Sequence, residues 1–269
     1  MLAKRLLTIV IALPLFAAAL IFLPQDLWAL FLLPALVIGG WEWAALAGYT
    51  RALRYAYAAM VALSGLALVY VVPGLVEAPT LADVIVYAAS ALFWLAVVPF
   101  WLGTLWTTRN PLVLGLAGWF ALVPMWLALV RLQQTAWLLL LVLSVVWIAD
   151  TAAYIAGKAL GRTKLAPRIS PGKTWEGALG AAAAVALYYG ALLLLVEPGE
   201  RYFDGWSGLA VFAVIMALSV EGDLFESWMK RQAGVKDSGQ LLPGHGGILD
   251  RIDGLTASVP IAALAYYLH

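Results

Sequence analysis

The chain has 269 residues, of which 64% are hydrophobic and 12% are charged, with a mean hydropathy of +0.94 and a formal net charge of +1. The charged share is about half of the ~25% typical of soluble domains, so a soluble protein of this length would expose large apolar surfaces. These figures exclude a soluble enzyme, a disordered chain and an ordinary secreted domain. The absence of cysteine from the sequence excludes disulfides and a cysteine nucleophile. The composition therefore predicts an all-α, polytopic integral membrane protein.

Nine apolar stretches are candidates for transmembrane helices, each of which needs about 20 residues to cross the bilayer. In chain order they are residues 6–25, 27–48, 55–76, 84–108, 110–130, 132–149, 177–196, 205–220 and 254–269. Residues 1–20 also fit a signal peptide, but the length of the apolar run and Pro14 favour an uncleaved first helix. We expect one continuous membrane domain, with N-terminal helices in 1–135 and a catalytic region in 136–269.

The basic residues are distributed very unevenly between the two sides of this predicted arrangement. With a cytoplasmic amino terminus, fourteen of the sixteen lysines and arginines fall on the inside, and only Arg131 and Arg201 fall outside. The inside residues are Lys4, Arg5, Arg51, Arg54, Arg109, Lys158, Arg162, Lys164, Arg168, Lys173, Lys230, Arg231, Lys236 and Arg251. This bias follows the positive-inside rule and supports nine spans in the plasma (inner) membrane.

Two polar segments, residues 150–177 and 221–253, fall on the inside and contain most of the unusual side chains. Basic residues there, including Arg162, Lys164 and Arg168, are accounted for by contact with anionic lipid headgroups. The carboxylates are not, because anionic lipids repel them and an acid at the end of a span is costly without a partner. The two segments therefore predict a polar site at the cytoplasmic membrane surface.

The spacing of the acids indicates the chemistry of that site. Asp223, Glu226 and Ser227 share one face of a helix, and Asp250 and Asp253 are spaced i, i+3 at the start of the last span. Carboxylate oxygens of this kind suit Mg²⁺. The cationic side chains between and beside the acids suit phosphate oxygens; they are Lys230, Arg231, Lys236, His245 and Arg251. Carboxylates and cations together indicate phosphoryl or nucleotidyl transfer to a lipid.

Residues 227–253 carry a pattern that resembles the phosphatidate cytidylyltransferases, also called CDP-diacylglycerol synthases. It reads Ser227-x-Met229-Lys230-Arg231-x4-Lys236-Asp237-x-Gly239-x3-Pro243-x-His245-Gly246-Gly247-x2-Asp250-Arg251-x-Asp253. The run from Ser170 to Gly177 is similar to a second motif of that family. The resemblance implies that CTP and phosphatidic acid give CDP-diacylglycerol and pyrophosphate with Mg²⁺, and it implies a homodimer. Membrane lipids are expected partners and nucleic acid is not.

We assign the expected roles within this reaction as follows. The expected metal ligands are Asp223, Asp250 and Asp253, with Asp237 next, and a second cation is possible because paired sites clamp both the entering and the leaving oxygens. Lys173, with Ser170 and Thr174, is expected to hold the CTP triphosphate. The remaining expected substrate-binding residues, not apportioned between lipid and nucleotide, are Ser227, Lys230, Arg231, Lys236, His245 and Arg251. For Asp237 a salt bridge with Lys236 or Arg231, and for His245 a structural role, are left as alternatives.

Other interpretations remain open at this stage. An ion-coupled transporter would also contain membrane acids, although such sites usually lie at the midplane of the bilayer. A CTP-dependent kinase of a polyisoprenoid alcohol would need similar groups together with a base for the hydroxyl. Asp150 is expected either to line the site or to cap a helix. Glu42 is expected to be a structural partner of Arg51 or Arg54.

Overall fold

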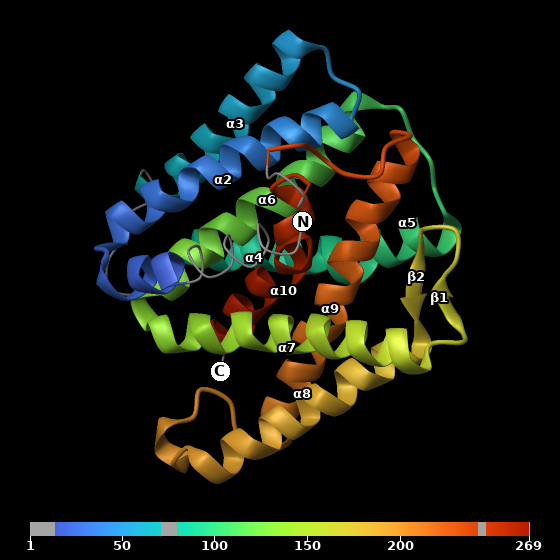
Figure 1. Cartoon of the computed structure of the whole chain (residues 1–269). Coiled ribbons are helices and arrows are strands. Elements are labelled where there is room, and N and C mark those ends of the chain that lie inside the picture. Colours follow the sequence, from blue (N-terminus) through green and yellow to red (C-terminus); the bar gives the residue numbers. More distant parts are fainter. Residues whose placement is uncertain (1–13, 71–79, 242–245, 269) are drawn as a thin grey trace.

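The structure of the protein is a computed structural model that describes residues 14–70, 80–241 and 246–268. The described chain is almost entirely helical (Figure 1). Its helices are α2 (Gln25–Leu46), α3 (Arg51–Tyr70), α4 (Leu81–Leu92), α5 (Val98–Thr104), α6 (Pro111–Leu132), α7 (Ala136–Leu160), α8 (Trp175–Leu195), α9 (Gly205–Gln232) and α10 (Leu249–Leu268). Shorter elements are the π-helical turn η1 (Phe93–Val97), the 3₁₀ turns η2 (Gln133–Thr135) and η3 (Pro198–Glu200), and the strands β1 (Lys164–Ala166) and β2 (Ser170–Thr174). Residues 14–22 are also helical.

The predicted all-α membrane fold is confirmed. Six helical stretches of the described residues are long and apolar enough to cross a membrane: Gln25–Leu46, Arg51–Tyr70, Leu81–Thr104, Pro111–Leu160, Trp175–Leu195 and Gly205–Gln232. The stretch from Pro111 contains both α6 and α7, which η2 separates. α10 matches α3 in length but has three charged residues in its first five positions. The count of nine crossings therefore stays a prediction, and the start of the first span lies outside the described residues.

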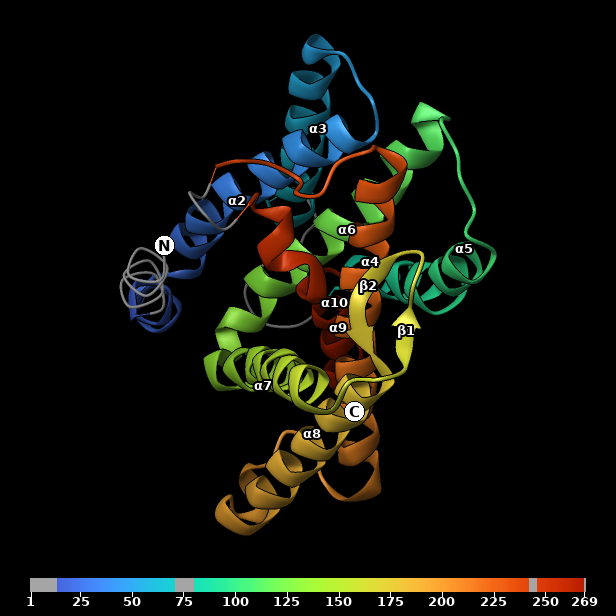
Figure 2. The ribbon, with the colours of Figure 1, turned by 45° about the vertical axis from the view of Figure 1, so that its right-hand side comes forward.

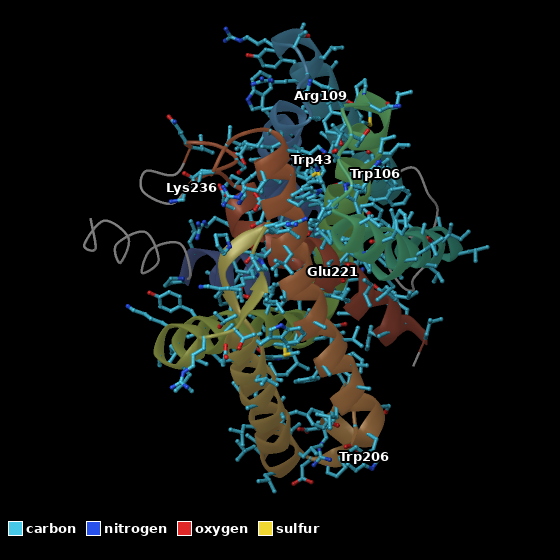
Figure 3. All side chains as sticks on the ribbon, turned by 90° about the vertical axis from the view of Figure 1, so that its right-hand side faces the viewer. Trp43, Trp106, Arg109, Trp206, Glu221 and Lys236 are labelled. Carbon is cyan, nitrogen blue, oxygen red and sulfur yellow. The ribbon has the colours of Figure 1, made fainter. Side chains whose placement is uncertain are left out.

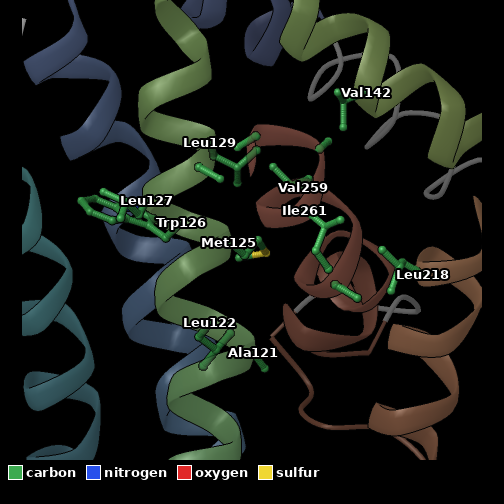
Figure 4. Packing of buried hydrophobic residues seen from close by; sticks show 14 of the residues in the cluster. Ala121, Leu122, Met125, Trp126, Leu127, Leu129, Val142, Leu218, Val259 and Ile261 are labelled. Carbon is green, nitrogen blue, oxygen red and sulfur yellow. The ribbon is translucent and has the colours of Figure 1, made fainter. Parts of the chain in front are cut away.

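α6 and α10 form the centre of the bundle. Sixteen of the 22 residues of α6 are buried, and α10 packs against α6, α9 and α4. In Figure 4, Met125 and Leu129 of α6 face Val259 and Ile261 of α10. α8 instead projects from the bundle beside α7 and α9 (Figure 2), and its surface is mostly exposed. The central helices thus provide a packed frame for the start of α10.

The first polar segment forms the end of α7, a two-stranded hairpin and the start of α8. β1 pairs antiparallel with β2, with Lys164 opposite Thr174. The Thr174 hydroxyl then caps α8 by accepting a hydrogen bond from the Gly177 N–H (3.1 Å). Glu176 accepts the backbone N–H groups of Arg162 and Thr163 (both 3.1 Å), which ties α8 to the end of α7. This arrangement fixes the position of β2 and of Lys173 on it.

The helices of the second polar segment extend beyond the apolar stretches that predicted them. The stretch 205–220 stops before Glu221, whereas α9 continues to Gln232, and α10 begins at Leu249 rather than at residue 254. An acidic residue ends an apolar stretch, but it does not end a helix when other side chains provide partners for its carboxylate. Asp223, Glu226, Asp250 and Asp253 therefore lie within regular helices, where their spacing is fixed, whereas Asp237 lies between α9 and α10.

A buried ion pair joins α4 and α6 at the end of the bundle away from the polar segments. Nε of Arg131 lies 3.3 Å from Oδ1 of Asp83, and the two side chains are 4% and 2% exposed. Asp83 also forms a capping box with Thr80 at the start of α4. The other end of α6 lies near the end of α9, because the Thr108 N–H donates to Gln232 Oε1 (3.1 Å).

Candidate active site

The two polar segments meet where β2, the second half of α9 and the start of α10 converge (Figures 1 and 2). Nζ of Lys173 on β2 lies 2.7 Å from Oδ2 of Asp223 on α9 and 3.4 Å from the carbonyl oxygen of Val220. The side chains of Lys173 and Asp223 are 21% and 36% exposed. This ion pair is therefore within reach of a ligand from outside the protein.

Asp223 lies at a close contact between α9 and α10. A side-chain carbon at Gly222 would overlap the carbonyl oxygen of Asp253, so the two helices approach each other at this glycine. Asp223 is near enough to Asp253 to act on it electrostatically. Its Oδ1 accepts a hydrogen bond from the Ser227 hydroxyl (3.2 Å), as the i, i+4 spacing predicts. Acids of both helices therefore lie at this contact between α9 and α10.

Lys230 lies about two helical turns beyond Asp223 on α9, between two carboxylates. Its Nζ is 2.6 Å from Oε2 of Glu226 and 2.6 Å from Oδ1 of Asp250 on α10. The three side chains are only 5% to 11% exposed. Burial of this kind requires pairing, because an unpartnered charge in such a place would be strongly destabilising. Lys230 therefore joins α9 to α10.

The second carboxylate oxygen of Asp250 holds the segment that precedes α10. Oδ2 accepts hydrogen bonds from the Ser238 N–H (3.0 Å), the Ser238 hydroxyl (3.0 Å) and the Gly247 N–H (2.8 Å). Both oxygens of Asp250 thus have partners in the protein. Here "the α9–α10 charge cluster" denotes six residues: Lys173, Asp223, Glu226, Lys230, Asp250 and Asp253.

The α9–α10 charge cluster has features that fit a divalent cation. It contains four carboxylates and two lysines, so negative groups are in excess. In the described part of the chain, no three Asp, Glu or His side chains form a group that could hold a metal ion. Mg²⁺ commonly uses only one or two carboxylates together with substrate phosphates and water. Asp223 and Asp253 suit that mode, since the Asp253 carboxylate accepts one hydrogen bond among the described residues, from the Gly254 N–H (2.8 Å).

The chain matches the Cytidylyltransferase family over residues 3–269. It belongs to this family. It is 41% identical over 272 residues to the phosphatidate cytidylyltransferase of Pseudomonas aeruginosa, covering 98% of this chain and 96% of that relative. The corresponding enzyme of Haemophilus influenzae is 40% identical over 196 residues (68% of this chain, 63% of the relative). That of Brucella suis is 56% identical over 127 residues (46% and 43%). The family predicted from residues 170–177 and 227–253 is confirmed.

Several predicted binding residues of this cytidylyltransferase lie around the charge cluster, and their roles stay predictions. Ser170 is half-buried on β2, whereas Thr174 is buried and caps α8. Arg231 is exposed, with Nε donating to the carbonyl oxygen of Ile169 beside β2 (3.2 Å). The remaining exposed residues are Lys236, Asp237 and Arg251. Lys236, labelled in Figure 3, lies in the segment that precedes α10. His245 lies outside the described residues.

The structure excludes one alternative for Asp150 and contradicts the expectation for Glu42. Asp150 lies exposed within α7 and therefore caps no helix, and its place in the site stays a prediction. The expectation that Glu42 pairs with Arg51 or Arg54 is wrong. Its carboxylate instead accepts hydrogen bonds from Ser238, Ile248 and Leu249. In the sequence, Glu42 is a single acid between two tryptophans in an apolar stretch. This pattern predicts a buried carboxylate that needs a partner, but it does not identify the partner.

Proposed function

We propose that this member of the family transfers the cytidylyl group of CTP to phosphatidate, giving CDP-diacylglycerol and pyrophosphate. An oxygen of the lipid phosphate attacks the α-phosphorus of CTP and forms a new P–O bond. The bond from the α-phosphorus to the oxygen that bridges to the β-phosphorus breaks, and its electron pair leaves with pyrophosphate. The observation that carries the proposal is the Lys173–Asp223 contact, which brings together the two polar segments, residues 150–177 and 221–253, in one accessible charged site. The relatives named for this activity support it.

The main barrier in this reaction is the repulsion between two anions. The lipid phosphate is already charged near neutral pH, so the chain need not supply a base to activate it. Lys173 is suited to the triphosphate because it lies beside the amino terminus of α8, whose N–H groups and dipole also favour anions. Magnesium held by Asp223 and Asp253 would neutralise phosphate charge and stabilise the departing pyrophosphate.

Lys173 must change its partner if Asp223 is to bind a cation. In the structure, Lys173 neutralises Asp223, and Lys230 neutralises Glu226 and Asp250. We propose that Lys173 turns from Asp223 to a phosphate oxygen, which leaves the carboxylate free for a cation. Lys230, Arg231 and Arg251 would bind the phosphates of the lipid and the nucleotide, and the proposal does not assign each residue to one of the two substrates.

We further propose that this site faces the cytoplasm from the inner membrane and that the protein acts as a homodimer. The support for the first part is the uneven distribution of basic residues, since the cytoplasmic side carries the excess in membrane proteins. CTP, a cytoplasmic nucleotide, would then reach the site directly, and phosphatidate would arrive from the surrounding leaflet. The dimer rests on the family resemblance alone.

The deciding experiment supplies purified protein with labelled CTP, phosphatidate vesicles and Mg²⁺. Formation of a CDP-lipid together with an equal amount of pyrophosphate is the expected result. Release of CDP with a phosphorylated polyisoprenoid alcohol, when that alcohol is supplied, would instead support the kinase. Lack of turnover with either lipid, in protein that drives ion-coupled uptake into vesicles, would overturn the proposal in favour of a transporter.

A further inference from the structure

Glu42 is a buried acid that none of the chemistry above uses. It lies on α2, 4% exposed, between Trp41 and Trp43. A carboxylate in such a position is costly unless hydrogen-bond donors surround it. No described lysine or arginine forms an ion pair with Glu42; Arg54, the basic residue beside it in a cavity of about 570 Å³, donates its Nε–H to the carbonyl oxygen of Tyr49 (3.0 Å).

Among the described residues, the hydrogen bonds of the Glu42 carboxylate all come from residues about 200 positions later in the chain. Oε1 accepts the Ile248 N–H (3.1 Å), and Oε2 accepts the Leu249 N–H (2.9 Å) and the Ser238 hydroxyl (3.1 Å). Leu249 is the first residue of α10, so these N–H groups have no partner within the helix. Glu42 therefore caps α10 from another helix, and the positive end of the α10 dipole stabilises its charge.

Ser238 connects Glu42 to the charge cluster. Its hydroxyl oxygen lies 3.1 Å from Glu42 Oε2 and 3.0 Å from Asp250 Oδ2, and its single proton can be donated to only one of them at a time. Side-chain carbons at Gly239 and Gly247 would overlap the Glu42 carboxylate. The segment that precedes α10 is thus closely fitted around this one acid.

We propose that Glu42 is a positioning residue: from α2 it holds Ser238 and the first turn of α10, so that Asp250 stays on Lys230 and Asp253 faces Asp223. This inference rests on the proposed function, because it assigns Glu42 to the placement of the carboxylates used in that reaction. Glu42 itself touches neither substrate. The α2 helix thereby contributes to a site whose other residues come from the second half of the chain.

The test compares Glu42→Gln with Glu42→Asp and with a structural control, Asp83→Asn, in folded, purified protein. The glutamine keeps the size but presents an N–H₂ group to at least one of the three donors. We expect kcat to fall by about tenfold or more while the KM for CTP changes less than about threefold, since substrate contacts remain. Glu42→Asp keeps the charge and should recover part of the loss. Asp83→Asn should lower the Tm but leave kcat per folded molecule within about twofold, because the described partners of Asp83, Arg131 and Thr80, lie at the end of the bundle away from the charge cluster.

Two further measurements separate positioning from stability. Amide hydrogen exchange should be about tenfold faster at Ile248 and Leu249 in Glu42→Gln and unchanged in the buried middle of α6. Adding Ser238→Ala should cost less in the Glu42→Gln background than in wild type, because the two residues act through one contact.

Wild-type exchange at these two amides, or a kcat loss no larger than that of Asp83→Asn, would overturn the inference. If the wild-type protein makes no CDP-lipid, the proposed function fails. The exchange measurement alone then decides whether Glu42 holds the start of α10.

Discussion

In the proposed reaction, Lys173 has two competing partners, the Asp223 carboxylate and the phosphates of CTP. The ion pair is partly exposed, so it contributes little to the stability of the fold. In the proposed reaction the same ammonium group would stabilise the transition state more strongly than the bound substrate, because negative charge grows on the departing pyrophosphate. A side chain of this kind should affect catalysis far more than folding.

Lys173→Met keeps the aliphatic stem and removes the charge. We expect a higher KM for CTP and a kcat lowered by roughly 10- to 100-fold, corresponding to a charge-assisted hydrogen bond of about 1.5–3 kcal/mol, with the KM for phosphatidate nearly unchanged. The matched control is Lys158→Met, since Lys158 is exposed and its ammonium lies over the ring of Tyr154. Steady-state kinetics with each substrate varied provides the measurement. Loss of phosphatidate binding with normal CTP affinity would place Lys173 in the lipid site instead.

Asp223 and Asp250, both expected as metal ligands, should respond differently to removal of their charge. Asp223→Asn should abolish nearly all turnover with little change in Tm, because the side chain is partly exposed and has few partners. Asp250→Asn should lose turnover and also about 2–4 kcal/mol of stability, because it disrupts a buried pair with Lys230 and the acceptor for Ser238. Thermal unfolding and turnover of each variant test the contrast. An unchanged Tm in Asp250→Asn would show that its bonds do not hold the segment.

The residue types of the site could be predicted from the sequence, but their pairing could not. The spacing of Asp223 and Ser227 predicted a shared helix face, and their hydrogen bond confirms it. No local pattern specifies that Lys173 meets Asp223 or that Lys230 meets Asp250, because these contacts depend on how whole helices pack. Glu42 shows the same limit, since its partners lie more than 190 residues away in the chain.

At the scale of elements, hydropathy located the helices well but misplaced their ends near the site. The predicted 177–196 lies within two residues of α8, in which only four of 21 residues are buried. The ends of α7 and α9 extend 11 and 12 residues beyond the predicted 149 and 220. Hydropathy detects where a chain contacts hydrocarbon, whereas helix length depends on backbone hydrogen bonds, which polar residues also form. The β1–β2 hairpin lies in the polar segment 150–177, for which hydropathy predicts no secondary structure.

Gly222 tests whether the contact between α9 and α10 matters for the site. Gly222→Ala should place a methyl group against the Asp253 carbonyl oxygen, shift one helix and lower both stability, by about 1–3 kcal/mol, and turnover. Gly190→Ala is the matched control, because Gly190 also lies within a helix and has no atom within 4 Å of an added side-chain carbon. The control should be neutral or stabilising by up to about 1 kcal/mol. Equal Tm values and equal turnover for the two variants would show that the helices tolerate separation.

At the scale of the whole molecule, charge distribution and fold agree. Figure 3 shows Arg109 and Lys236 toward one end of the molecule and Trp206 at the other. Of the sixteen basic residues, the two predicted outside are both bound to acids: Arg131 to Asp83 (3.3 Å) and Arg201 to Asp204 (3.0 Å). The positive-inside rule counts lysines and arginines rather than net charge, so these two residues remain exceptions and the orientation stays a prediction.

Topology reporters provide the test of this arrangement. We expect a reporter fused after Arg109 or after Leu165 to lie in the cytoplasm, and one fused after Gln133 or after Arg201 to lie outside. Arg109 and Gln133 flank α6, Gln133 and Leu165 flank α7, and Leu165 and Arg201 flank α8, so consecutive sites are separated by one long helix. A reversed result at all four sites would place the active site outside, where CTP is absent, and would contradict the cytoplasmic site. A reversal at Gln133 alone would show that α6 and α7 do not each cross the membrane, and the nine-span arrangement would then be wrong.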